Sequence, residues 1–88
     1  MVTKTYKVTD EAGLHARPAS ILCKKAMTFD GDVNIVYKDK KSTLKSIMIL
    51  MSLGIPHNAE FNIEVIGDGE EILLEELTSV LKEHDIID

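Results

Sequence analysis

The residue types with the greatest chemical potential lie together in one short segment of the chain. His15 stands at the junction between a loop that ends in Gly13-Leu14 and a helix that the following pattern predicts from Ala16. A side chain at this junction lies over backbone N–H groups without helical partners and over the positive end of the helix dipole. This positive potential favours the neutral imidazole, which is a nucleophile. The N–H groups of Ala16 and Arg17 can then hold an anion that the ring accepts.

Arg17 strengthens this interpretation, because its guanidinium can pair with two phosphoryl oxygens at once. A loop histidine, a helix N-terminus and an arginine are together suited to forming a transient phosphohistidine. The residues alone leave a second interpretation open, in which His15 only caps the helix.

The other histidines and the cysteine do not extend this site. His57 and His84 show neither HxxxH nor His-Cys spacing, and they lie far from His15 along the chain. We therefore predict no metal site and expect both side chains on the surface. Cys23 falls on the apolar face of the predicted helix and is expected to pack in the core.

Nucleotide-binding and hydrolase signatures are not found in the sequence. It contains no GxxxxGKS/T segment to hold ATP, and Gly67-Asp68-Gly69 lacks the third glycine of a dinucleotide-binding turn. Ser20 and Ser46 lie outside any GxSxG elbow. The sequence therefore predicts no bound cofactor.

Length and composition indicate a small globular protein. The 88 residues are 44% hydrophobic and 28% charged, which fits one domain over residues 1–88 with a thin, two-layered core. The single cysteine excludes an internal disulfide framework and fits a reducing compartment. The N-terminus does not have the pattern of a signal peptide, and no segment favours membrane insertion. We expect a cytoplasmic monomer.

The charge is unevenly distributed along the chain. The net charge is −5, yet residues 1–45 hold nine of the ten basic residues against five acids, whereas residues 46–88 hold one against ten. A basic N-terminal half suits acidic partner proteins, and the alternative is an ordinary solvated surface. An acidic domain without interleaved aromatic residues is a poor candidate for direct nucleic-acid binding.

Hydrophobic periodicity predicts alternating strands and helices. The pair Asp68 and Glu71 has the spacing of a capping box and is expected to begin the last helix. The expected elements are strands at 2–9, 33–37, 41–44 and 61–65, and helices at 16–27, at 47–52 and after Asp68. This βαββαβα order predicts an α+β fold, an open-faced β-sandwich in which a mainly antiparallel four-stranded sheet carries three helices on one face.

The short helix predicted after Ser46 is unusually apolar. Ser46 itself stands where a helix cap belongs, and capping is one interpretation of this residue. Ile47, Met48 and Met51 belong to a run that is apolar on all sides, which a thin sandwich cannot bury completely. We expect an exposed docking patch beside His15, because methionine surfaces suit several partners. The alternative is that all of them lie in the core.

Two segments resemble one known family. Residues 13–20, GLHARPAS, closely resemble the active-site segment of HPr, the histidine-containing phosphocarrier family of the bacterial phosphoenolpyruvate-dependent sugar phosphotransferase system. Residues 44–55 resemble the regulatory segment of the same family. Both segments lie at the family's usual spacing, and the chain length and the order of elements match from end to end.

The resemblance implies that His15 accepts a phosphoryl group on Nδ1 from phosphorylated enzyme I and passes it to the histidine of a sugar-specific enzyme IIA. Arg17 would stabilise the phosphoryl group. The residues implied in partner docking are Ser20, Ile47, Met48 and Met51. Such a protein is a cosubstrate of the phosphotransferase system rather than an enzyme with its own turnover.

The resemblance also implies regulation at Ser46. In low-GC Gram-positive members of the family, an ATP-dependent HPr kinase/phosphorylase modifies the matching serine, and the modified form binds a catabolite control protein. Ile49 departs from the pattern, since relatives commonly carry glycine there. Two alternatives remain, a nitrogen-branch phosphocarrier and a binding-only catabolite-repression homologue. His15 disfavours the second, because such homologues lack the active-site histidine.

Overall fold

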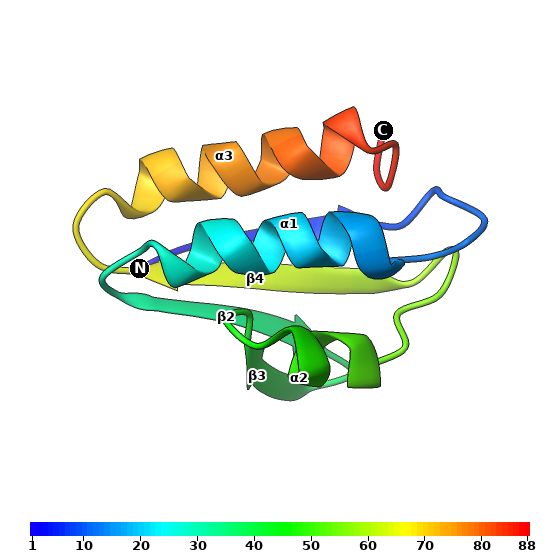
Figure 1. Ribbon diagram of the computed structural model, residues 1–88, viewed down its shortest axis with the longest axis horizontal. Helices are drawn as coiled ribbons and strands as arrows, with labels where there is room; N and C mark the ends of the chain where they lie inside the picture. The colour runs from blue at the N-terminus through cyan, green and yellow to red at the C-terminus, as the bar shows by residue number, and fades with distance from the viewer.

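The chain folds into four strands and three helices in the order that the hydrophobic pattern predicts (Figure 1). The computed structural model describes residues 1–88. The elements are β1 (Val2–Lys7), α1 (Ala16–Met27), β2 (Asp32–Tyr37), β3 (Lys40–Thr43), α2 (Ile47–Ser52), β4 (Glu60–Ile66) and α3 (Glu70–Glu83). The strands lie in the order β1-β4-β2-β3, and every neighbouring pair is antiparallel. The predicted fold class is confirmed.

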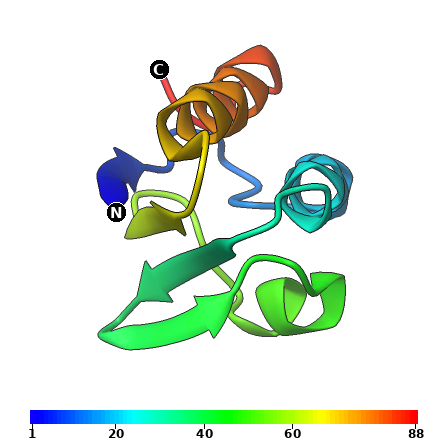
Figure 2. The same ribbon diagram turned by 90° about the vertical axis from the view of Figure 1, so that its left-hand side faces the viewer.

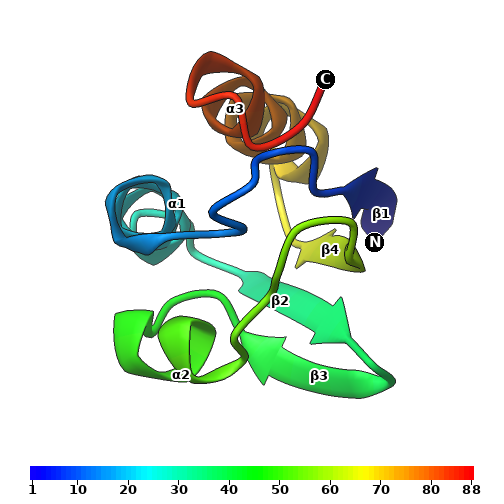
Figure 3. The ribbon, with the colours of Figure 1, turned by 90° about the vertical axis from the view of Figure 1, so that its right-hand side faces the viewer.

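All three helices lie on one side of the sheet, and the opposite face is open (Figure 2, Figure 3). Helix α3 packs against β1 and β4, α2 packs against β3, and α1 lies between these two helices and contacts both. The longest helix, α3, has 14 residues, and none of the three has the length and apolarity of a membrane span.

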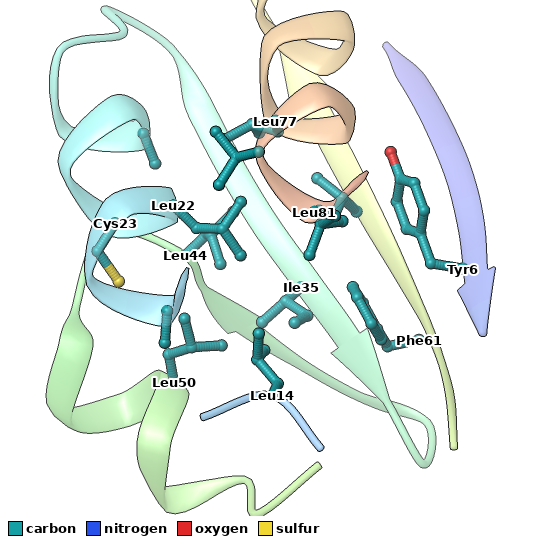
Figure 4. Packing of buried hydrophobic residues seen from close by; sticks show 14 of the residues in the cluster. Tyr6, Leu14, Leu22, Cys23, Ile35, Leu44, Leu50, Phe61, Leu77 and Leu81 are labelled. Carbon is teal, nitrogen blue, oxygen red and sulfur yellow. The ribbon is translucent and has the colours of Figure 1, made fainter. Parts of the chain in front are cut away.

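The covered face of the sheet forms one continuous hydrophobic core of 21 buried residues. The register places Ile35 opposite Ile63 and Tyr6 opposite Phe61, so that the same face of each strand points toward the helices. Figure 4 shows Tyr6, Ile35 and Phe61 on the face of the sheet that the helix side chains, among them Leu22 and Leu81, cover. The core is thin, as the chain length predicts, and it fixes how the helices sit on the sheet.

Helix α1 has the predicted bounds. Its buried stripe includes Cys23, as its position on the apolar face predicts, and burial raises the pKa of this thiol. A buried, protonated thiol is a packing group rather than a nucleophile. Pro18 stands in the first turn, where its missing N–H removes no helical hydrogen bond.

The predicted cap of α3 is wrong. Gly69, and not Asp68, occupies the N-cap position, and no side chain caps this helix. Gly67 and Gly69 both have positive φ, 146° and 80°, and the turn that they form moves the start of the helix one residue later. The side chain that reaches back is therefore Glu70 rather than Glu71, and its Oε1 accepts the N–H of Gly67 at 3.3 Å.

Candidate functional site

The loop between β1 and α1 is held at both of its ends. The N–H of Thr9 donates to the carbonyl of Ile86 at 2.8 Å, and the N–H of Leu14 donates to the carbonyl of Ile55 at 3.0 Å. Gly13 has a φ of 72°, and a Cβ there would lie 2.5 Å from the Ile55 oxygen. Only glycine fits this close approach. Two segments distant in sequence, at Ile55 and Ile86, therefore hold the loop that leads into α1.

His15 stands at the N-cap of α1 with an extended backbone, φ −93° and ψ 178°. Its carbonyl accepts the N–H of Ala19 at 3.1 Å, which begins the helical hydrogen bonding. Its imidazole makes no capping hydrogen bond, and 43% of the side chain is exposed. His15 therefore occupies the N-cap position, as the second interpretation expects, but its imidazole makes no capping hydrogen bond and remains accessible.

The imidazole contacts an acidic residue that the sequence reasoning missed. Its Nε2 lies 3.3 Å from Oδ2 of Asp10, whereas Nδ1 has no hydrogen-bond partner within the chain. The only signal in the sequence was an acidic side chain five residues before the histidine. That spacing has no fixed geometry in a loop, so the contact became visible only in three dimensions.

The first turn of α1 presents donors without partners. The N–H groups of Ala16 and Arg17 make no hydrogen bond within the chain. The guanidinium of Arg17 is exposed and takes part in no hydrogen bond or ion pair. The first turn of α1, directly after His15, thus carries two unpaired N–H donors and the positive charge of Arg17, and such a helix start is suited to an incoming anion.

Ser46 caps the second helix, as its position predicts. Its Oγ accepts the N–H of Ile49 at 3.3 Å. The preceding residue, Lys45, is tied to the loop between α1 and β2, because its Nζ donates to the carbonyls of Phe29 and Gly31 at 2.8 and 2.7 Å. The backbone that leads into Ser46 is therefore fixed, and the Lys45 ammonium is engaged with main-chain oxygens.

Helix α2 exposes most of its apolar side chains. Met48 is 82% exposed, and Ile47, Ile49 and Met51 are each about 40% exposed, whereas Leu50 is buried. The alternative in which the whole run lies in the core is therefore wrong, and the predicted exposure is confirmed. The role of these side chains in docking stays a prediction.

A groove runs between α1 and α2. It is lined by Ser20 and Met27 on α1 and by Ser46, Ile47 and Met48 at the start of α2, among others. Ser20 lies five residues after His15, about 7.5 Å further along the helix axis. The structure thus brings three of the four predicted docking residues into one groove together with the regulatory candidate, whereas Met51 lies on α2 outside it.

The remaining candidates stay apart from this site. His57 is exposed and His84 is half-buried. No three histidine, cysteine or acidic side chains are grouped so that they could hold a metal ion.

Comparison with protein families gives one match over almost the whole chain. The model for the PTS HPr component phosphorylation site matches residues 2–83. This range contains both the loop histidine and the capping serine described above.

Solved structures of similar proteins have the same fold. The histidine-containing phosphocarrier protein of Mycoplasma is 31% identical, with 99% of each chain covered and a TM-score of 0.94. The phosphocarrier protein HPr of Bacillus anthracis is 35% identical, with 90% of this chain and 94% of that chain covered and a TM-score of 0.80. The Bacillus subtilis catabolite repression protein Crh, described as a swapped dimer, is 34% identical over 100% of both chains, with a TM-score of 0.71.

Proposed function

This chain belongs to the HPr family of phosphocarrier proteins, and from that premise we propose that His15 carries a phosphoryl group on Nδ1. The donor in this proposal is phosphorylated enzyme I, and the acceptor is a histidine of a sugar-specific enzyme IIA. The supporting observation is the constellation at the start of α1. An accessible imidazole without a capping hydrogen bond stands at the N-cap of α1, and the helical turn that follows carries two unpaired N–H groups and the unpaired guanidinium of Arg17.

Phosphoryl transfer between two imidazoles needs little covalent assistance. The Nδ1 lone pair forms the new N–P bond while the donor's N–P bond breaks, and the electrons of that bond return to the donor ring. The protein has to supply in-line positioning and stabilisation of the phosphoryl charge. In this proposal the N–H groups of Ala16 and Arg17 and the guanidinium of Arg17 supply that stabilisation.

Regulation at Ser46 is a second part of the proposal. A phosphate on Oγ would lie at the N-terminus of α2, where negative charge is compatible with the helix. It would also lie beside the exposed side chains of Ile47 and Met48. In this proposal HPr kinase/phosphorylase adds the phosphate, which repels acidic enzyme I from the docking groove and favours a catabolite control protein instead.

The groove between α1 and α2 lies next to the proposed phosphorylation site and is part of the surface that we propose for partner binding. We place the partner contacts on the surface that joins His15 to the groove, through Ser20, Ile47, Met48 and Met51. The protein acts in this proposal as a cytoplasmic monomer and as a cosubstrate.

A regulatory paralogue that works only by binding is the main competitor. Overall similarity does not decide between the two, since the identity to Crh, 34%, equals that to phosphocarriers within a few per cent. His15 with its anion site favours the carrier over a binding-only protein. A nitrogen-branch carrier would use the same residue with other partners.

One labelling experiment tests both parts of the proposal. The purified chain is incubated either with labelled phosphoenolpyruvate and enzyme I or with labelled ATP and HPr kinase/phosphorylase. We expect label on the wild type in both reactions, loss of only the first label in His15→Ala, and loss of only the second in Ser46→Ala. A wild type that takes no label from enzyme I would rule out the carrier function, and size-exclusion chromatography of the same sample reports its oligomeric state.

A further inference from the structure

The carboxylate of Asp10 joins the helix-starting loop to the imidazole. Its Oδ1 accepts the N–H of Ala12 at 2.9 Å, and its Oδ2 lies 3.3 Å from Nε2 of His15. The Asp10 carbonyl also accepts the N–H of Gly13 at 2.9 Å. Each carboxylate oxygen therefore has one partner, and a closed turn holds the side chain in place.

This arrangement distinguishes the two ring nitrogens. A carboxylate only accepts hydrogen bonds, so its Oδ2 favours the ring form that carries a proton on Nε2. In the neutral ring the lone pair is then on Nδ1, which has no partner within the chain. We propose that Asp10 is a positioning residue that keeps the His15 proton on Nε2, so that Nδ1 receives the phosphoryl group. This inference rests on the proposed function, which it deepens.

The same proton serves both directions of transfer. Nδ1 of the neutral ring attacks phosphorus, the donor's N–P bond breaks toward the donor ring, and the Nε2 proton stays where it was. The phosphorylated ring is then an imidazolium, whose positive charge faces the Asp10 carboxylate. When the phosphoryl group leaves for the next acceptor, the electrons of the N–P bond return to Nδ1 and the neutral Nε2–H ring is restored. No proton has to be delivered or removed in either step.

Two substitutions at Asp10 separate this role from a structural one. Asp10→Ala removes the acceptor, and the ring should move toward a mixture of its two neutral forms. Asp10→Asn keeps an oxygen for the Ala12 N–H, so the turn is preserved, but it presents amide N–H groups to Nε2. It should therefore favour the Nδ1–H form, in which the lone pair is on the wrong nitrogen. Glu11→Gln is the matched control, because it removes one negative charge from the next, exposed residue.

The primary measurement is the pair of imidazole ¹⁵N chemical shifts of His15, recorded for the unphosphorylated protein at a pH where the ring is neutral. The fraction of Nε2–H should decrease in the order wild type, Asp10→Ala, Asp10→Asn, with Glu11→Gln equal to wild type. Kinetics with enzyme I should show kcat lowered about two- to fivefold in Asp10→Ala and further in Asp10→Asn, with KM unchanged. Circular dichroism checks that each variant is folded.

Several results would overturn the inference. They are unchanged ring shifts in both Asp10 variants, a shift in the ring form without any loss of kcat, and an equal loss in Glu11→Gln. The ring shifts are measured without any partner protein. If enzyme I failed to label the wild type, the proposed function would fail while the ring shifts still decided whether Asp10 holds the proton.

Discussion

At the scale of single residues, His15 and Arg17 have separable parts in the proposed transfer. His15 supplies the bond to phosphorus, and Arg17 supplies charge that the neighbouring N–H groups partly replace. Neither side chain belongs to the core. Substitutions at these two positions should therefore change transfer without changing the fold.

We expect His15→Ala to fold like the wild type and to take no phosphoryl group from enzyme I. Its free energy of unfolding should lie within about 0.5 kcal/mol of the wild type, because a half-exposed side chain without a capping bond is removed. Urea unfolding and labelling from phosphoenolpyruvate measure the two quantities. His57→Ala, at an exposed histidine elsewhere, is the control, and equal labelling of both variants would disprove the role of His15.

We expect Arg17→Ala to slow transfer without abolishing it, with kcat/KM lowered by about a hundredfold at most. Arg17→Lys should recover part of the loss, because it restores the charge but not the bidentate geometry. Rates are measured with enzyme I and with enzyme IIA, and Lys40→Ala serves as a control for net charge. Unchanged rates with both partners in Arg17→Ala would remove Arg17 from the site.

Among the candidate site residues, the sequence could predict those that are neighbours along the chain. His15, Ala16 and Arg17 are consecutive, so one helix start determines their relation, and they could be predicted together. The contact of Asp10 with His15 depends on the path of the loop between β1 and α1, which distant segments hold. No spacing rule describes such a path, and the residue was missed.

At the scale of elements, α2 combines a regulatory candidate with an apolar surface. Ser46 caps the helix, and the exposed side chains follow at once. A charge placed on the cap therefore lies at the edge of the surface that we propose for docking.

We expect Ser46→Asp to weaken docking of enzyme I rather than to unfold the protein. A carboxylate at this N-cap can accept the Ile49 N–H and can stabilise the helix by roughly 0.5 kcal/mol. Near an acidic partner it should raise the KM of enzyme I for this protein, and higher salt should relieve part of the defect. Enzyme I kinetics at two salt concentrations measure both effects.

The control for this experiment is Thr5→Asp, which adds the same charge to an exposed position of β1 away from the groove. A defect confined to kcat, a defect that salt leaves unchanged, or an equal defect in Thr5→Asp would contradict the electrostatic explanation.

Element boundaries were predictable where the hydrophobic stripe determines them. The apolar spacing of α1 marks its length, and its bounds agree with the structure. The start of α3 was missed by one residue because Gly67 and Gly69 adopt positive φ, which their identity permits but does not require. A capping pattern in the sequence therefore does not specify the N-cap residue where neighbouring glycines allow several backbone conformations of the turn.

At the scale of the whole molecule, one buried polar chain connects the edge strand to the last helix. The hydroxyl of Tyr6 on β1 is hydrogen-bonded to Oγ1 of Thr78 on α3, which in turn donates to the carbonyl of Leu74 at 2.8 Å. Burial raises the pKa of Tyr6, and the hydrogen bond with Thr78 opposes this effect only in part.

We expect alkaline pH to destabilise the protein through Tyr6. The pKa of this phenol is higher in the folded than in the unfolded chain, so its contribution is complete below the unfolded value of about 10 and is lost as the pH rises above it. At pH 8, Tyr6→Phe should lower the free energy of unfolding by about 1 kcal/mol. The difference between wild type and Tyr6→Phe should shrink between pH 8 and pH 10.5, as measured by urea unfolding.

Thr78→Val is the control for this measurement, because it removes the hydrogen-bond partner but keeps the phenol. It should retain the alkaline loss of stability. A difference between wild type and Tyr6→Phe that stays constant or grows with pH would contradict the assignment to Tyr6.

The strand order β1-β4-β2-β3 could not be predicted from the sequence, although the number and type of the elements could. Alternation in each strand indicates which side chains face the core, and it is the same for any arrangement of neighbours. The placement of β4 between β1 and β2 depends on pairing between residues far apart in the chain.

The bond from Thr9 to the carbonyl of Ile86 has a consequence for how the protein is made. Ile86 is fully buried, and β1 pairs only with β4, so the loop that holds His15 is completed by residues that follow it by more than half of the chain. During synthesis, His15 leaves the ribosome long before β4, which pairs with β1, and Ile86, which holds its loop, have been made. Unfinished or C-terminally clipped chains would carry His15 without the loop geometry around it, and only a chain made as far as Ile86 would have the complete site for the phosphoryl transfer that we propose.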